Sequence, residues 1–215
     1  MLNVYGNPFS SPSNKVRYAV SALNIEVGLE HEFHTVDLAG GEQRGAAFMA
    51  LNPMSRVPVI QDGDFTLTES DAILRYLATK HKSDLFPDDL EARANIDRWM
   101  GFAGLHLGQA MGRVMFNRVL YKFIGQEPDE RSLAFGLKMI GTDGAHLNKV
   151  LESREFIAGD SVSLADIATI AALDPAEISQ VDLSEFKALS DWRKRVTAME
   201  FYQNVHTHFG AELGM

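Results

Sequence analysis

Hydrophobic and polar residues follow two different periods in the amino-terminal part of the chain. Over residues 2–6 apolar and polar positions alternate with a period of two, which predicts a short strand that ends at Gly6. Val16, Val20 and Leu23 then recur at positions i, i+4 and i+7, the spacing of one helix face. The chain is therefore expected to begin with a strand followed by a helix.

The same reading extends through the next sixty residues or so. Residues 31–38 predict a second strand, and residues 42–51 predict a weak helix. Residues 57–60 and 65–67 are strand-like and flank an Asp-Gly pair, which is a hairpin signal. A helix is predicted over residues 69–81. A strand–helix–strand start followed by a hairpin implies a mixed sheet with helices packed on it.

The pattern changes after residues 82–89, which are polar, contain a proline and are predicted to be a linker. Helical periodicity then dominates over residues 91–118, 130–152, 163–173 and 186–199. The segment SLADIATIAAL is apolar nearly all round, so it is expected in the middle of the helical half. The predicted fold class is an α/β part with a mixed sheet, followed by an all-α part.

Composition excludes several function classes. Hydrophobic residues make up 46% and charged residues 23%, the balance of a globular protein, and the net charge of -9 argues against nucleic acid as a partner. The absence of cysteine excludes disulfides, zinc–thiolate sites and a cysteine nucleophile. No signal peptide and no apolar run of roughly 20 residues are recognised, so no membrane partner is expected. The seven histidines show no metal-binding spacing, and HTH near the carboxyl end is expected at the surface.

The segment SRVPVIQDGDFTLTESDAI contains a proline where a strand is predicted. A cis bond between Val57 and Pro58 would leave the backbone groups of Val57 free to pair with an extended peptide. The alternative is an ordinary trans proline at a sheet edge. On this proline alone, the alternative is favoured.

The motif TESDAI begins at Thr68, ten residues after Pro58. Thr68 and Asp71 fit a capping box, which would put Glu69 and Ser70 in the first helical turn. Free N–H groups and a serine hydroxyl there suit a carboxylate, and an adjacent glutamate suits an ammonium group. The pair fits an α-amino acid head group, and ordinary helix-start composition is an equally good explanation.

A third segment, NPFSSPSNKVRYAV, lies between the first predicted strand and the first predicted helix. Ligands of open α/β sheets bind at the carboxyl ends of strands, which makes Ser10, Ser11 and Ser13 candidates for chemistry. The alternative is that Ser13 or Asn14 caps the helix and that the other serines are turn residues.

Taken together, these motifs resemble one family over essentially the whole chain. NPxS before KVR, NPMSRVPVI, DGDFTLTESDAI and SLAD in the helical half look like a cytosolic glutathione S-transferase of the serine type, phi-like or of a related bacterial class. The resemblance implies a thioredoxin-like, glutathione-binding domain over residues 1–81, a linker over 82–90 and an all-α domain over 91–215. It also implies a cytoplasmic homodimer that uses glutathione as co-substrate and needs no cofactor or metal.

The family pattern assigns roles to individual residues. Val57, with Pro58 in cis, would pair with the cysteinyl backbone of glutathione, and Glu69 and Ser70 would take the γ-glutamyl head group. The glycine carboxylate would be bound by Gln43, Arg44 and Arg56, although the phi-like pattern has His at the first position and Lys at the last. Ser163 and Asp166 of SLAD would form a capping box, with Asp166 buried and structural.

Glutathione supplies the thiol that the chain lacks. By its spacing, Ser10 matches the hydroxyl that stabilises the thiolate, and Ser11 remains a competitor because Ser11-Pro12 fits a reductase-like pattern. Tyr5 is expected in the core, because a shift of one residue turns a strand side chain to the other face. The electrophile site would be lined by Phe9, Met111, Met115 and Phe116, with bundle core as the alternative for the last three.

The implied function is conjugation of glutathione to a small hydrophobic electrophile. Two alternatives stay open: a glutathione-dependent disulfide reductase of the same fold, and a non-catalytic protein that binds glutathione or a hydrophobic ligand.

Overall fold

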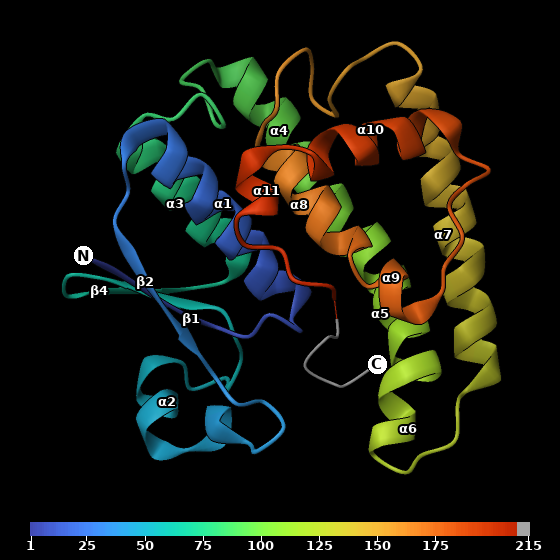
Figure 1. The fold of residues 1–215 in the computed structure, drawn as a ribbon, viewed down its shortest axis with the longest axis horizontal. Coiled ribbons are helices and arrows are strands. Elements are labelled where there is room, and N and C mark those ends of the chain that lie inside the picture. The colour runs from blue at the N-terminus through green and yellow to red at the C-terminus, as the bar shows by residue number, and fades with distance from the viewer. Residues whose placement is uncertain (210–215) are drawn as a thin grey trace.

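The computed structural model describes residues 1–209 and contains a sheet-bearing part followed by a helical part (Figure 1). The four strands are β1 (Leu2–Gly6), β2 (His31–Thr35), β3 (Val59–Asp62) and β4 (Phe65–Thr68). The helices beside them are α1 (Ser11–Val27), α2 (Ala46–Leu51) and α3 (Ser70–His81), and a 3-10 turn over Glu42–Arg44 precedes α2. The predicted order of strands and helices is confirmed.

The four strands form a mixed sheet in the order β2-β1-β3-β4. β1 pairs in parallel with β2 and antiparallel with β3, and β3 and β4 form the predicted hairpin. Val4 and Ile60 face α1 and α3 on one side of the sheet, where the main core begins. Val36 and Val59 pack with Phe48 of α2 on the other side. The thioredoxin-like expectation is therefore confirmed.

Two predicted strands have different limits in the structure. The strand expected over residues 57–60 begins at Val59 and continues to Asp62. It starts late because Pro58 has no N–H to give to the ladder. The second strand ends at Thr35, three residues before the expected limit of residue 38.

The rest of the described chain is helical. Its elements are α4 (Leu90–Phe102), α5 (Gly108–Met115), α6 (Tyr121–Phe123), α7 (Glu130–Leu151), α8 (Leu164–Leu173), α9 (Ala176–Ser179), α10 (Lys187–Thr197) and α11 (Glu200–Gln203). The helix expected over residues 91–118 is longer and segmented, because π-helical turns over 103–107 and 116–120 join α4, α5 and α6.

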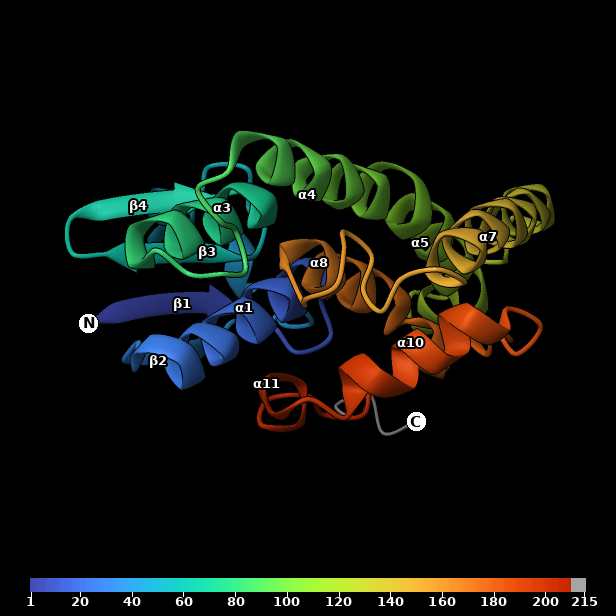
Figure 2. The ribbon, with the colours of Figure 1, turned by 90° about the horizontal axis from the view of Figure 1, so that it is seen from above.

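Helix α8 lies at the centre of the helical part, between α4 and α10 and against the end of α1 (Figure 2). All ten of its residues are buried, as its uniformly apolar sequence predicts. The capping box of Ser163 and Asp166 is present. Asp166 also accepts hydrogen bonds from the Ile157 N–H at 3.0 Å and the Trp192 indole at 2.8 Å, which confirms its structural role.

The segment between α3 and α4 packs against the helical part. α3 ends at His81 and α4 begins at Leu90, yet Leu85 and Phe86 are buried. The Leu85 carbonyl accepts a hydrogen bond from the N–H of Leu164, the first residue of α8, at 3.0 Å. This connection therefore fixes the sheet-bearing part to the centre of the helical part.

Within residues 1–209, no helix combines the length and apolarity that crossing a bilayer requires.

Candidate glutathione site at the sheet edge

Strand register brings the three sequence motifs to one edge of the sheet. The carboxyl end of β1 lies beside the amino end of β3, because Tyr5 pairs with Val59. Val59 in turn pairs with Thr68, which ends β4 immediately before Glu69. The serine loop (residues 7–13, from the end of β1 into the first turn of α1), the cis proline and the start of α3 are therefore neighbours in space. They are dispersed over sixty residues of sequence.

The serine loop presents Ser10 as the N-cap of α1. The Ser10 hydroxyl oxygen accepts a long hydrogen bond of 3.4 Å from the Ser13 N–H, and the helix begins at Ser11. The alternative in which Ser13 or Asn14 caps the helix is therefore wrong. Because the Ser10 oxygen acts as an acceptor in the cap, its own proton remains available for a ligand.

The three serines differ in their exposure. Ser10 and Ser11 are partly exposed, whereas Ser13 is fully buried and its hydroxyl has no hydrogen-bond partner among residues 1–209. A Cβ at Gly6 would lie 3.0 Å from the Ser13 Cβ, so the glycine allows α1 to approach the end of β1 closely. Ser13 is thus enclosed under the loop and presents no hydroxyl to the surface.

Side-chain amides hold the backbone of the serine loop. Asn7 Nδ2 donates to the Val36 carbonyl at 2.9 Å, and Asn7 Oδ1 accepts from the Phe9 N–H at 2.8 Å. Asn14 Nδ2 donates to the Pro8 carbonyl at 2.7 Å. These bonds fix the backbone on both sides of Phe9 and so define the position from which Ser10 projects.

The cis bond before Pro58 confirms the conformation that the family pattern implies. Pro58 is buried, while Val57 is partly exposed and precedes the first paired residue of β3. The N–H and C=O of Val57 therefore lie outside the ladder, at the edge that the serine loop shares. This is the arrangement in which a short extended peptide adds to a sheet edge.

The start of α3 differs from the prediction. The N-cap is Glu69, no side chain caps the helix, and the expected capping box of Thr68 and Asp71 is absent. Glu69 has φ 66° and ψ 108°, a strained conformation for a residue with a side chain. The first-turn N–H groups of α3 have no side-chain cap and lie beside the partly exposed Ser70 and the exposed Glu69, a combination that suits a carboxylate with an adjacent ammonium group.

Asp71 is instead paired with a residue of α1. Lys15 Nζ donates to Asp71 Oδ1 at 2.6 Å, and the two side chains are only 10% and 29% exposed. The pair links the second turn of the serine-capped helix α1 to the first turn of α3. No sequence signal identified Lys15, because its partner is 56 residues away along the chain.

The candidates for the glycine carboxylate lie in less regular structure. Gln43 belongs to the 3-10 turn, and its Oε1 is buried with no hydrogen-bond partner among the described residues. Its Nε2 makes only a 3.5 Å contact with the Leu38 carbonyl. Arg44 and Arg56 are exposed.

The candidates for the electrophile site are divided between the surface and the core. Phe9 is partly exposed, and its ring centroid lies 5.3 Å from that of Phe209. Met111 is fully buried and contacts the Ser179 hydroxyl through its sulfur, and Met115 is 8% exposed, so both belong to the bundle core. Phe116 is 51% exposed beside Tyr121.

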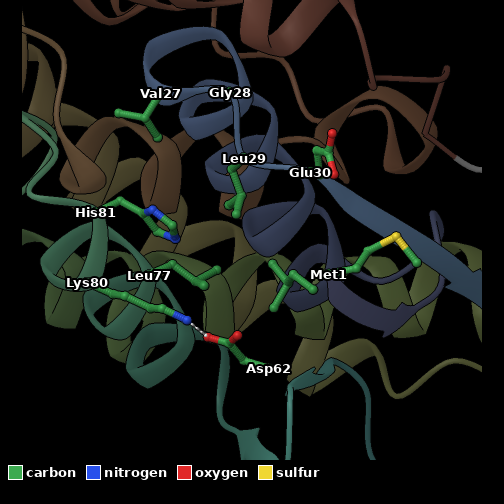
Figure 3. Close-up of a pocket in the computed structure, with 10 residues that line it drawn as sticks. Met1, Val27, Gly28, Leu29, Glu30, Asp62, Leu77, Lys80 and His81 are labelled. Carbon is green, nitrogen blue, oxygen red and sulfur yellow. Dashed lines mark hydrogen bonds and ion pairs between the residues drawn. The ribbon is translucent and has the colours of Figure 1, made fainter.

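Two surface cavities lie outside this edge. A cavity of about 370 Å³ is formed where β1 begins, at the opposite end from the serine loop, and includes Met1, Lys80 and His81 (Figure 3). Lys80 there makes an ion pair with Asp62. A second cavity of about 510 Å³ lies beside α10 and α11.

Within residues 1–209 no group of His, Asp or Glu side chains is arranged to hold a metal ion.

Comparison with known proteins gives one consistent family. Residues 1–79 match the glutathione S-transferase N-terminal domain, and residues 143–200 match the glutathione S-transferase C-terminal domain. The human glutathione S-transferase theta-1 is 32% identical over 95% of this chain and 87% of its own length. The rat glutathione S-transferase theta-2 is 33% identical over 99% of this chain and 88% of its own length.

Comparison with solved structures gives the same family. The apo form of human glutathione S-transferase T1-1 has a TM-score of 0.87 at 31% identity, covering 99% of this chain and 91% of that one. Glutathione transferase F7 from Populus trichocarpa has a TM-score of 0.86 at 24% identity, covering 97% of this chain and 99% of that one, a likeness of fold. The fold and these matches define a glutathione transferase architecture. The chain belongs to the glutathione S-transferase family, and the human and rat relatives named above are of the theta class.

Proposed function

We propose that this transferase binds glutathione along the edge shared by the serine loop, Val57 and the start of α3, and that Ser10 donates a hydrogen bond to the glutathione thiolate. One observation carries the proposal: strand register gathers these segments at one edge, with the Ser10 hydroxyl at the N-cap of a 17-residue helix. Ser11 is the alternative donor, since it is also partly exposed.

The other groups of glutathione are assigned to residues of the site by their charge and their hydrogen-bonding capacity. The ammonium group of the γ-glutamyl unit pairs with Glu69, and its carboxylate accepts hydrogen bonds from Ser70 and the first-turn N–H groups of α3. The cysteinyl backbone pairs with Val57 beside Pro58. For the glycine carboxylate, the side chains with donors to offer are Gln43, Arg44 and Arg56.

Catalysis requires the thiolate, because the thiol is a much weaker nucleophile. A free thiol has a pKa of about 8.5, so only a few per cent is ionised at pH 7. A hydroxyl donor and the N-terminus of α1 lower that pKa by about one to two units, or roughly 1.4–2.7 kcal/mol. The proton leaves to solvent. The sulfur then bonds to the electrophilic carbon while the leaving group departs with its electron pair.

The electrophile is proposed to bind beside Phe9, between the sheet-bearing and helical parts. The partly exposed Phe9 ring and the exposed Phe116 ring offer apolar surface. Met111 and Met115 support this region from inside the bundle.

Single replacement of each serine tests the thiolate donor. In Ser10→Ala, the ultraviolet absorbance of bound glutathione should titrate one to two units higher, while immobilised glutathione still retains the protein. Ser13→Ala is the matched control and should titrate like the wild type. The Ser10 assignment fails if Ser11→Ala, and not Ser10→Ala, moves the midpoint. If none of the proteins is retained on immobilised glutathione, the binding site itself is wrong.

Substrate comparison separates conjugation from disulfide reduction. A transferase should turn over an aryl halide at least tenfold faster than a mixed disulfide of glutathione. The opposite order would favour the reductase, for which Ser11-Pro12 is the sequence feature.

The proposal also covers the domain division, the oligomeric state and the cellular compartment of the protein. We propose a division into a glutathione-binding domain (1–81) and a helical domain (91–215), and a cytoplasmic homodimer. Exposed apolar side chains support the dimer: Phe65 on β4, Leu90 at the start of α4 and Leu105 after it are 47%, 80% and 67% exposed. Light scattering should give twice the chain mass of 23.8 kDa. A monomer would refute the assembly without affecting the site.

A further inference from the structure

A buried polar cluster joins five elements behind the serine loop. Its centre is Asp174, the fully buried residue that follows α8. Asp174 accepts hydrogen bonds from the hydroxyl of Tyr18 on α1 at 2.6 Å and from the hydroxyl of Tyr202 on α11 at 3.0 Å. Burial raises the pKa of Asp174 to about 6, and the two hydroxyls oppose that rise. The carboxylate is thus retained in the core by donors from two separate helices.

The cluster continues outward through His206. His206 Nδ1 lies 2.7 Å from the Tyr18 hydroxyl oxygen. With the proton of Tyr18 donated to Asp174, the His206 tautomer that has its proton on Nδ1 can donate to the Tyr18 oxygen. His206 Nε2 faces Glu177 Oε1 at 3.4 Å, and Arg193 faces the same oxygen at 3.6 Å. The expectation that HTH lies at the surface is wrong for His206, whose side chain is 14% exposed.

Glu177 connects His206 to the backbone that follows α11. Its Oε2 accepts the Phe209 N–H at 3.0 Å. Burial alone raises the pKa of Glu177, but hydrogen bonds from His206 and from the Phe209 N–H, together with the charge of Arg193, outweigh burial and lower it. Arg17 of α1 also donates to the Val205 carbonyl at 2.6 Å. Residues 205–209 are therefore fixed at three points.

The fixed segment ends on the serine loop. Phe209 is 1% exposed, and its ring packs on the ring of Phe9 at 5.3 Å with an angle of 33° between the ring planes. Asn7 and Asn14 hold the backbone around Phe9 through hydrogen bonds with backbone groups. Within the described residues, Phe209 is the one aromatic ring packed on Phe9.

We propose that the Asp174 cluster is a clamp that holds Phe209 against Phe9, so that Phe209 sets the orientation of the Phe9 ring and with it the preference for the electrophile. Phe209, Tyr18 and Asp174 are positioning residues in this role. The inference rests on the proposed function, since Phe9 is there a wall of the electrophile site. The Ser10 hydroxyl is positioned by the cap and the asparagines, so thiolate activation is independent of the clamp.

Amide hydrogen exchange tests the clamp without glutathione or turnover. Tyr18→Phe removes the hydroxyl that joins Asp174 to His206, and the amide of Phe209 should exchange at least tenfold faster. Tyr76→Phe is the matched control, because the Tyr76 hydroxyl also donates to a carboxylate, Asp62 at 2.7 Å, far from the clamp. Equal exchange of the Phe209 amide in Tyr18→Phe and the wild type would overturn the clamp.

Calorimetry with two glutathione thioethers tests the effect on the electrophile site. S-hexylglutathione fills that site with its alkyl chain, whereas S-methylglutathione leaves it nearly empty. Phe209→Ala should reduce the preference for the hexyl over the methyl compound about tenfold and leave the methyl dissociation constant within twofold. Phe209→Leu should keep most of the preference, and Phe156→Ala is the control for a buried aromatic elsewhere in the helical part.

The results distinguish this inference from the proposed function. If Phe209→Ala keeps the wild-type preference, Phe209 has no role in the electrophile site and the inference fails while glutathione binding stands. If the wild type binds neither thioether, the proposed glutathione site fails and takes the electrophile half of the inference with it. Exchange at Phe209 would then still decide whether the clamp exists.

Discussion

At the scale of single residues, Ser10 and Ser13 lie one turn apart in α1 and have opposite environments. Ser10 accepts a capping hydrogen bond at the edge of the site, and Ser13 is buried with an unpaired hydroxyl. The sequence pattern identified the serine loop and put Ser10 ahead of Ser11 by its spacing, but it could not show how exposed each hydroxyl is. Exposure separates Ser13 from the other two, and exposure depends on how closely α1 approaches Gly6.

Ser13→Ala should leave the protein as stable as the wild type or stabilise it by up to about 1 kcal/mol. A buried hydroxyl without a partner is costly, and alanine removes that cost while leaving only a small void. Ser10→Ala should destabilise the protein by roughly 1 kcal/mol through loss of the N-cap. Urea denaturation of both variants measures the difference. A loss of more than about 1 kcal/mol in Ser13→Ala would mean that its hydroxyl has a partner after all.

At the scale of elements, most helices and strands follow from local periodicity, and the exceptions have identifiable causes. Helix α8 is apolar all round and lies where its pattern predicts. β3 begins two residues late because Pro58 has no N–H to give to the ladder. The capping box expected at α3 is absent because Asp71 pairs with Lys15 on another helix. A local motif cannot reveal such competition, since the competing partner lies far away in sequence.

The Lys15–Asp71 pair should couple the two helices that frame the glutathione site. Lys15→Met and Asp71→Asn each leave a partly buried polar group without its partner, so each should destabilise the protein by about 1–3 kcal/mol. The double variant should lose less than the sum, with a coupling of about 1–2 kcal/mol. Both single variants should also weaken glutathione binding, because the N-terminus of α1 is proposed to contact the cysteinyl sulfur and that of α3 the γ-glutamyl head group.

A double-mutant cycle by urea denaturation, with calorimetry of glutathione binding, measures this coupling. The pair of Arg93 and Asp88 provides the control, since Asp88 is 90% exposed and surface pairs contribute about 0–1 kcal/mol. Additive losses for Lys15 and Asp71 would show that the ion pair has no energetic role.

At the scale of the whole molecule, the two-part architecture and the glutathione edge were predictable from sequence. Strand order and register then explain why motifs dispersed along the chain meet at one edge. The clamp was not predictable, because Tyr18, Asp174 and His206 come from three distant segments with no shared motif. Asp174 follows an apolar helix and reads in the sequence as an ordinary helix-end residue; only packing shows that it is buried.

Burial of Asp174 has a consequence for stability that extends over the whole fold. Its pKa is raised to about 6, above the ordinary value of 3.8, so the folded state binds more protons than the unfolded state between these pH values. Stability contributed by this group is therefore present below about pH 4 and is lost as the pH rises through about 6. The loss amounts to about 3 kcal/mol, at about 1.4 kcal/mol for each pKa unit.

Asp174→Asn should remove this dependence. Carboxyls whose pKa is lowered, such as Asp62, add stability as the pH rises, but they remain in both proteins and cancel in the comparison. The stability of the variant relative to the wild type should therefore increase by about 3 kcal/mol between pH 4 and pH 7.5. Urea denaturation across that range measures it. Parallel profiles for the two proteins would mean that Asp174 titrates alike in the folded and unfolded chain, and that two tyrosine hydroxyls fully compensate its burial.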